Sequence, residues 1–179
     1  MSNILYIVVP CYNEQEVLPE TSKRLREKVQ TLRQSGKIDA DSRILFVNDG
    51  SKDATWEMIQ KLHEENSVFS GVNLSRNRGH QNALLAGIAV AAEHADMIVS
   101  MDADLQDDVD AMDRMIDAYE AGNDIVYGVR SSRQKDTFFK RNTALAFLPD
   151  ASFPGGGDRV QSRGLPAVKQ TCRKRTPVF

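Results

Sequence analysis

Cysteine is scarce in this chain: only Cys11 and Cys172 occur among its 179 residues, and they lie far apart in the sequence. There is no CxxC pair and no cluster of histidine with cysteine, so the sequence predicts neither a zinc site nor a disulfide framework. A reducing, cytoplasmic setting is therefore expected.

Long hydrophobic runs are also missing. No window reaches the roughly 18 uninterrupted apolar residues of a membrane-spanning helix. The apolar run over residues 4–9 is too short, and too poor in preceding positive charge, to be a signal peptide. We expect this chain to be soluble or at most peripheral to a membrane, and a homo-oligomer is compatible with the sequence.

A strong excess of charge is absent, since the formal net charge is -2 and the isoelectric point is near 5.9. Without a general basic field, nucleic acid is not an expected partner, and a small anionic ligand would need a local arrangement of donors. No GxGxxG follows the first apolar run and no GxxxxGK[ST] occurs anywhere. A nucleotidyltransferase or a dehydrogenase is therefore disfavoured.

What the sequence does hold is a regular alternation of short apolar runs with amphipathic stretches, and its 41% hydrophobic content suffices for one packed core. The runs expected to be strands cover residues 4–9, 43–48, 71–74, 97–101 and 124–128. The stretches expected to be helices cover residues 16–32, a segment capped by Ser51 or Asp53, 83–94 and 109–120. Pro10 is expected to end the first strand. This alternation predicts an α/β fold with a doubly wound, mostly parallel sheet and helices on both faces.

The composition changes near residue 148. Residues 149–179 hold four of the six prolines, four of the eleven glycines, and six Lys/Arg against two Asp, without apolar periodicity. We therefore expect one domain over residues 1–147, followed by an atypical basic tail over residues 148–179 that lacks order. The alternative is that apolar side chains of the tail dock onto bare sheet surface.

Three polar clusters directly follow expected strands. They lie at residues 12–14 (YNE), 48–51 (NDGS) and 102–107 (DADLQD). Ligands of open α/β sheets bind beyond the carboxyl ends of the strands. We therefore expect these three clusters to converge on one edge of the sheet.

The third cluster is the candidate metal site. Asp102 and Asp104 supply hard oxygen ligands for Mg2+ or Mn2+, and such an ion can bridge the phosphates of a nucleotide. The alternative is a helix start, in which Asp104 or Asp107 caps the helix that follows.

The first two clusters each leave two interpretations open. Asp49 could accept hydrogen bonds from a ribose or a base, or it could belong to an ordinary Asp-Gly turn. Tyr12 could stack on a base, and Glu14 could bind the ligand or cap the first helix.

A fourth polar segment, residues 75–82 (SRNRGHQN), precedes an expected helix N-terminus. Arg76, Arg78 and Gly79 in this place suit a phosphate, and a solvated basic loop is the alternative. His80 is the only histidine in a plausible site, and it is not assigned as a base.

In their order along the chain, residues 9–14 (VPCYNE), 47–51 (VNDGS), 76–81 (RNRGHQ) and 102–107 (DADLQD) resemble the motifs of family 2 inverting glycosyltransferases, which have the GT-A fold. The most similar subgroup is the polyprenyl-phosphate sugar transferases. The resemblance covers about residues 3–147. It implies a UDP- or GDP-sugar donor, a polyprenyl-phosphate acceptor and transfer at the cytoplasmic face of a membrane.

The resemblance also implies roles for individual residues. Mg2+ or Mn2+ would be held by Asp102, Asp104 and Gln106. Arg130, which comes after Tyr127 and Gly128, matches a GxR-like segment that lies near the phosphates or the acceptor in relatives. The residues expected to bind the nucleotide-sugar are Pro10, Tyr12, Glu14, Asp49, Arg76, Gly79, Asp102, Ala103, Asp104 and Arg130.

After residue 147 the family pattern is no longer recognisable. Relatives continue with an acidic residue that acts as a base or positions the acceptor, and Asp150 and Asp158 receive no such role here. The catalytic residue is therefore unknown, and the chain is expected to be truncated or frame-shifted at this point. A fragment that binds nucleotide-sugar and metal without transfer is the alternative function.

Overall fold

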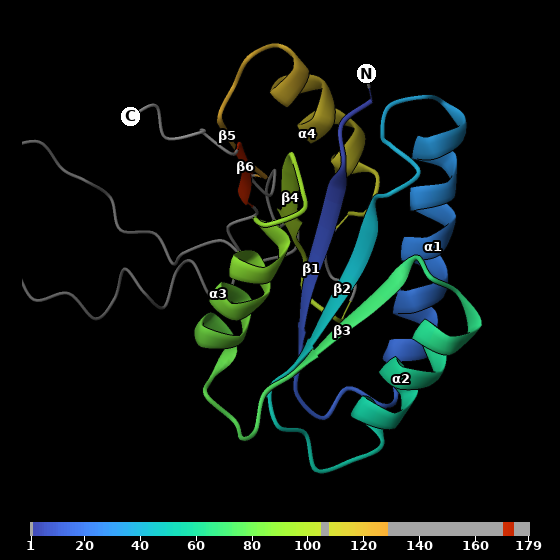
Figure 1. Cartoon of the computed structure of the whole chain (residues 1–179), viewed down its shortest axis with the longest axis vertical. Coiled ribbons are helices and arrows are strands. Elements are labelled where there is room, and N and C mark those ends of the chain that lie inside the picture. Colours follow the sequence, from blue (N-terminus) through green and yellow to red (C-terminus); the bar gives the residue numbers. More distant parts are fainter. Residues whose placement is uncertain (1, 105–107, 129–169, 174–179) are drawn as a thin grey trace, which may run out of the picture. The chain divides into compact units, whose positions relative to one another are not determined.

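The structure, a computed structural model, describes residues 2–104 and 108–128 and the backbone of residues 170–173 (Figure 1). The strands of this part form a six-stranded sheet in the order β3-β2-β1-β4-β6-β5. They are β1 (Leu5–Cys11), β2 (Arg43–Asn48), β3 (Phe69–Asn73), β4 (Met97–Ser100), β5 (Ile125–Tyr127) and β6 (Gln170–Arg173). The helices are α1 (Leu18–Gln34), α2 (Thr55–Glu65), α3 (His80–Ala91) and α4 (Ala111–Glu120).

The strands β3, β2, β1 and β4 are parallel, with Ile44 paired to Phe69, Tyr6 to Arg43, and Leu5 to Met97. Such pairs need a crossover, and α1, α2 and α3 provide it. The predicted α/β fold with a mostly parallel sheet is therefore confirmed.

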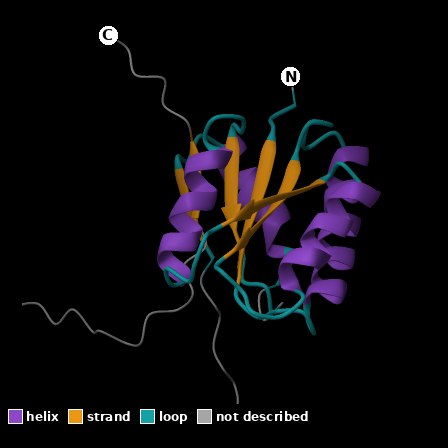
Figure 2. Cartoon of the chain, turned by 60° about the horizontal axis from the view of Figure 1, so that its bottom comes forward, coloured by secondary structure: helices purple, strands orange, loops and turns teal. Residues whose placement is uncertain are grey.

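Successive residues of β1 serve opposite faces of the sheet, because side chains alternate along a strand. Leu5, Ile7 and Val9 join the core cluster that contains the buried side chains of α1, α2 and α4. Val8 joins a second cluster, which contains the buried alanines of α3. Figure 2 shows helices on both sides of the sheet, as the sequence predicted.

The first strand runs two residues further than predicted, through Pro10 to Cys11. The carbonyl of Cys11 accepts a hydrogen bond from the Asp49 N–H, so the backbone of Pro10 faces the other neighbour, β4. Pairing of β1 with β4 ends at Val8, which lies opposite Ser100. The N–H that proline lacks is therefore not needed by the sheet, and Pro10 does not end the strand.

Helix starts differ most from the prediction. The residues at the N-caps are Val17, Ala54, Gly79 and Asp110, and none of them makes a side-chain capping hydrogen bond. Asp104 is therefore not the cap of α4, and Ser51 is not the cap of α2. Asp53 lies one residue before the N-cap of α2, and its Oδ1 accepts the Thr55 N–H at 3.1 Å, so the side chain of Asp53 does satisfy a backbone N–H at the start of this helix.

Glu14 serves α1 through its backbone. Its carbonyl accepts hydrogen bonds from the N–H groups of Val17 at 3.2 Å and Leu18 at 3.0 Å. The interpretation of the Glu14 side chain as the cap of this helix was wrong. Its carboxyl is thus available for the edge of the sheet.

The strand β6 lies in the tail, where the sequence predicted no regular element. It pairs antiparallel with β4 and with β5. The predicted domain boundary at residue 147 stays a prediction, because residues 129–169 lie outside the described part. Among the described residues, no helix combines the length and the apolar character needed to cross a membrane.

Candidate functional site

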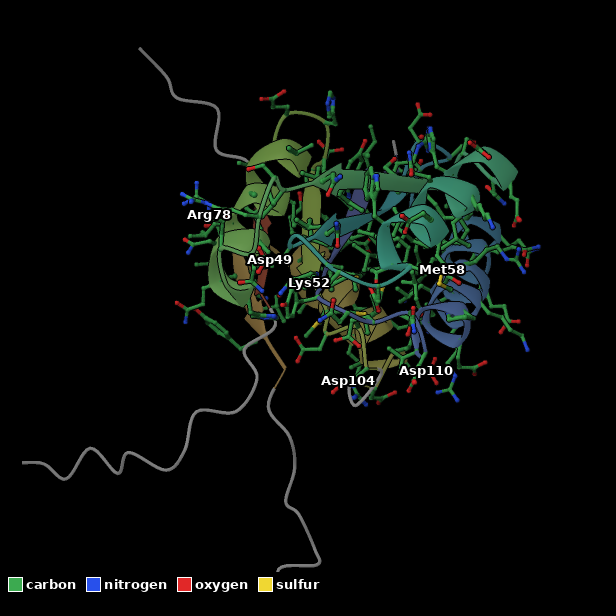
Figure 3. All side chains as sticks on the ribbon, turned by 90° about the horizontal axis from the view of Figure 1, so that it is seen from below. Asp49, Lys52, Met58, Arg78, Asp104 and Asp110 are labelled. Atoms are coloured by element: carbon green, nitrogen blue, oxygen red, sulfur yellow. The ribbon has the colours of Figure 1, made fainter. Side chains whose placement is uncertain are left out.

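The carboxyl ends of β1, β2 and β4 lie at one edge of the sheet, because the three strands are parallel. Figure 3 views the molecule from this side, and the labelled residues Asp49, Lys52, Arg78 and Asp104 lie on it. The described parts of the three polar clusters therefore meet at this edge.

The loops after β1 and β2 are bonded to each other. The N–H of Asn13 donates to Ser51 Oγ at 3.0 Å, and the N–H of Lys52 donates to Asn13 Oδ1 at 2.9 Å. The N–H of Glu14 donates to Thr55 Oγ1 at 2.9 Å. Asn13 has a φ of 56°, a left-handed conformation that asparagine adopts more readily than most residues. These bonds hold the first two loops as one unit.

Asp49 holds the loop that precedes α3. Its side chain is buried, with 2% exposure, and Oδ1 accepts the Arg78 N–H at 2.6 Å while Oδ2 accepts the Gly79 N–H at 2.9 Å. This role differs from both interpretations drawn from the sequence, a ligand contact and an Asp-Gly turn. A contact of Asp49 with a base or ribose stays a prediction.

Gly50 brings the same two segments into direct contact. Its φ is 65°, and a Cβ added there would lie 2.5 Å from backbone atoms of both Arg76 and Asn77. Only glycine allows this approach without a shift of the backbone. The loop that carries Arg76 and Arg78 is thereby fixed against the end of β2.

Successive side chains of the loop after β4 lie alternately in the core and at the surface. Met101 and Ala103 are buried, whereas the side chain of Asp102 is 40% exposed and Asp104 is exposed. The carbonyl of Ala103 accepts a hydrogen bond of 2.6 Å from Thr21 Oγ1 on α1. The two carboxylates thus extend from a backbone whose alternate residues are anchored in the core.

Negative charge accumulates where the loops meet. The pKa of the Glu14 carboxyl is raised above its ordinary 4.5, first by burial and then by the carboxylates of Asp104 and Asp53. A cation placed among these groups would therefore be stabilised. A cavity of about 410 Å3 borders the same region, lined by Asn13, Glu14, Gln15, Glu16, Val17, Lys52 and Asp53.

The donor set suits a nucleotide-bound metal better than a cage made by the protein alone. The described residues contain no group of three or more His, Cys, Asp or Glu side chains arranged to hold an ion. Mg2+ at nucleotide sites is commonly bound by one or two carboxylates, with phosphate oxygens and waters as its other ligands. Asp102 and Asp104 fit this requirement.

The remaining predicted site residues lie in different environments. Tyr12 is 41% exposed, and Pro10 is buried within β1. Arg76 and Gly79 are exposed beside the start of α3, where Gly79 has a φ of 87°. His80 Nε2 lies 3.7 Å from Asp102 Oδ1, which brings the loops before α3 and after β4 together. Gln106 and Arg130 lie outside the described residues.

Two residues that shape this edge, Thr21 and Thr55, were not found from the sequence. They bond to partners 82 and 41 positions away. Asn13 and Ser51 lie in the predicted clusters, but the bond between them, across 38 positions, was not predicted. A single sequence carries no signal that pairs such distant positions, and serine and threonine are common on any surface.

A four-stranded parallel sheet with an acidic DAD segment at its carboxyl edge defines the class: this is the GT-A fold, shared with solved glycosyltransferase structures. Glycosyl transferase family 2 matches residues 6–171, and the chain belongs to this family.

Curated relatives resemble most of this chain. The uncharacterized glycosyltransferase YkoT of Bacillus subtilis is 51% identical over 144 residues, which are 80% of this chain and 43% of that protein. The bactoprenol glucosyl transferase of Shigella phage SfV is 37% identical over 141 residues, which are 79% of this chain and 43% of that protein. The matched part of this chain thus covers 43% of the length of each of these two relatives.

Solved structures share the fold at low identity. Staphylococcus aureus TarS in complex with UDP has a TM-score of 0.52 and 17% identity, over 74% of this chain and 40% of that chain. The mannosyltransferase PcManGT from Pyrobaculum calidifontis, in complex with GDP-Man and Mn2+, has a TM-score of 0.50 and 20% identity, over 76% of this chain and 37% of that chain.

Proposed function

We propose that this chain is the nucleotide-sugar-binding part of a glycosyltransferase that transfers a sugar, with inversion, from a UDP- or GDP-sugar to a polyprenyl phosphate. The observation that carries the proposal is the convergence of Glu14, Asp102 and Asp104 with the Asp49-anchored loop at one sheet edge, in a family 2 chain. Membership of the family supports sugar transfer, and the geometry supports a site for the donor.

The choice of donor and acceptor is supported by relatives. One structure of the same fold holds UDP, and another holds GDP-Man and Mn2+. Relatives at 37% identity are named bactoprenol glucosyl transferases, which supports a polyprenyl-phosphate acceptor. The reaction would then take place at the cytoplasmic face of a membrane.

Different residues at the sheet edge would bind different parts of the donor. Asp102 and Asp104, with Gln106, would hold Mg2+ or Mn2+. When bound, the ion neutralises the charge that develops on the departing diphosphate. The exposed guanidinium groups of Arg76 and Arg78 would attract the same diphosphate, and exposed Tyr12 offers a ring on which a base can stack.

The acceptor makes a strong general base unnecessary. A phosphate oxygen is already ionised near neutral pH, so its attack on the anomeric carbon requires little proton removal. Holding the two substrates in line then supplies much of the rate enhancement. We assign no residue of this chain as the base.

Calorimetry with UDP and GDP tests the metal dependence. We expect binding in Mn2+ or Mg2+ and none in excess chelator, because Asp102 and Asp104 would otherwise repel the diphosphate. Equal affinity in both buffers would contradict a metal role. Nucleotide binding without transfer to polyprenyl phosphate would support the alternative of a binding-only fragment.

The substitution Asp104→Asn tests the assigned ligand. We expect metal-dependent nucleotide affinity to fall by about tenfold or more, with little change in melting temperature, because an exposed carboxylate contributes little to the core. Asp41→Asn is a matched control, since it removes the same charge from an exposed position beyond the other end of β2. A large drop in melting temperature for Asp104→Asn would instead indicate a structural role.

A further inference from the structure

Thr21 is a completely buried polar residue near the start of α1. Its hydroxyl Oγ1 lies 2.6 Å from the carbonyl oxygen of Ala103, 82 positions further along the chain. A second acceptor, the carbonyl of Val17, lies 3.0 Å away in the same helical turn. A threonine hydroxyl has one proton to donate, so one carbonyl receives it at a time.

The surroundings of the two carbonyls decide which one receives the proton. The Val17 carbonyl already accepts the backbone N–H of Thr21 at 3.0 Å, so it has a partner without the hydroxyl. Ala103 is 4% exposed, and a buried carbonyl without a partner is costly. The shorter bond is therefore a cross-link between α1 and the loop after β4.

This cross-link lies between the two acidic residues of the loop. On the strand side, the N–H of Met101 donates to the Val8 carbonyl at 3.0 Å, so the sheet fixes the backbone before Asp102. On the far side, the bond to Ala103 fixes the backbone before Asp104. These two anchors determine the positions from which both carboxylates extend.

The same end of α1 also holds the loop after β1. The Glu14 carbonyl accepts the N–H groups of Val17 and Leu18, one turn before Thr21. The N-terminal end of α1 is thus bonded to both loops that bring carboxylates to the sheet edge.

We propose that Thr21 is a positioning residue of the metal–diphosphate centre: its hydroxyl holds the Ala103 peptide so that Asp102 and Asp104 meet a divalent cation in one geometry. This inference rests on the proposed function. Groups that orient metal ligands from outside the coordination shell typically change metal affinity by about 10- to 100-fold.

The test compares three variants of the full chain. Thr21→Val keeps the branched shape and removes the hydroxyl, and Thr21→Ser keeps the hydroxyl. Ser22→Ala is the matched control, because Ser22 is buried beside Thr21 but its Oγ donates, within the described residues, only to the Pro19 carbonyl of the same helix, at 3.0 Å. Mn2+ affinity in the presence of UDP or GDP is measured by electron paramagnetic resonance.

We expect Thr21→Val to weaken Mn2+ binding by about 10- to 100-fold, and Thr21→Ser and Ser22→Ala to stay close to wild type. Mn2+ binding by folded Thr21→Val at wild-type strength overturns the proposal. So does an equal loss in Ser22→Ala, because that result would trace the effect to a general weakening of α1.

A wild-type chain that fails to bind Mn2+ would contradict the proposed function, and the anchor is then tested by hydrogen exchange over residues 101–104. Faster exchange in Thr21→Val than in wild type and Ser22→Ala supports the positioning of the loop by Thr21. Equal exchange in all three overturns it.

Discussion

Gly50 shows at the scale of one residue how the site edge is assembled. It is the point where the end of β2 meets the backbone of Arg76 and Asn77, and it combines a left-handed φ with a contact that excludes any side chain. Gly36, which follows α1, has a similar φ of 72° but no heavy atom within 4 Å of an added Cβ. Substitutions at Gly50 and Gly36 therefore distinguish the effect of a left-handed backbone conformation from the effect of a close backbone contact.

We expect Gly50→Ala to destabilise the protein by roughly 2–5 kcal/mol, since it adds a backbone clash to the strain of a left-handed alanine. Gly36→Ala should cost only about 1–2 kcal/mol, from the strain alone. Urea unfolding of both variants measures the difference. Equal losses would show that the loop before α3 moves away from Gly50 at no cost.

The reactivity of the Cys11 thiol is a second prediction about a single residue. Burial, and to a smaller extent the charge of Glu14, raises the pKa of its thiol to about 12. Since the thiolate is the reactive form, Cys11 should resist iodoacetamide at pH 8 in the native protein and react after unfolding in urea. Peptide mass spectrometry distinguishes Cys11 from Cys172. Rapid native labelling of Cys11 would mean that the end of β1 opens readily.

At the scale of elements, Lys28 joins α1 to α4. Its side chain is 10% exposed, and Nζ contacts carboxylate oxygens of Asp110, at 2.8 Å, and Asp113. Hydrogen bonding and charge attraction from Lys28 lower the pKa of the Asp110 carboxyl below its ordinary 3.8. A carboxyl with a lowered folded-state pKa stabilises the fold above its unfolded pKa, and this contribution is lost as the pH falls through the folded value.

The substitution Lys28→Met should therefore lower the melting temperature near pH 7, and the difference from wild type should shrink as the pH falls below 3.8. The methionine retains much of the apolar packing of the lysine stem, so the charge is the main change. Lys23→Met, at an exposed position of the same helix, is the control and should match wild type throughout. A pH-independent difference for Lys28→Met would point to packing instead.

Elements were predictable where a local pattern determines them. The run at residues 43–48 is β2 itself, because the buried centre of a parallel strand, here Ile44 to Val47, is apolar at every position. Pro10 led to a wrong prediction of the strand end, because a sheet tolerates a proline where pairing with the neighbouring strand has already stopped. The start of α3 was placed at residue 83 rather than His80, because Asp49 and Gly79 order a polar segment that has no apolar periodicity.

The sequence predicted which residues lie at the candidate site, but it did not predict the hydrogen bonds between them. Parallel strands bring their carboxyl ends together, so the positions of Glu14, Asp49, Asp102 and Asp104 followed from the pattern alone. The use of the Asp49 carboxylate to hold two backbone N–H groups depends on a contact between segments 29 positions apart. No local pattern encodes that contact.

At the scale of the whole molecule, β6 links β4 to β5. It pairs with Met97–Val99 on one side and with Ile125–Tyr127 on the other, although it comes from the segment predicted to be a tail. A strand in this position covers the edge of β4, which would otherwise expose unpaired backbone groups.

Removal of residues 169–179 should therefore speed hydrogen exchange in β4 and β5, while amides of β1 and β2 stay protected by their own pairing. Exchange followed by mass spectrometry on both chain lengths measures this. A truncation that ends at residue 173 retains β6 and serves as the control. Unchanged exchange in β4 and β5 would restore the interpretation of the whole tail as unstructured.

The bonds between the loops at the sheet edge affect the rate of ligand binding and the conformational entropy that is lost on binding. The Asn13, Asp49 and Thr21 bonds set the loops in place before any ligand arrives, so little backbone freedom remains to be lost on binding. Capture should then follow a single second-order step, with a rate proportional to ligand concentration and no plateau from a slow rearrangement. The edge would act as a preformed receptor, whose selectivity arises from the fixed spacing of its charges.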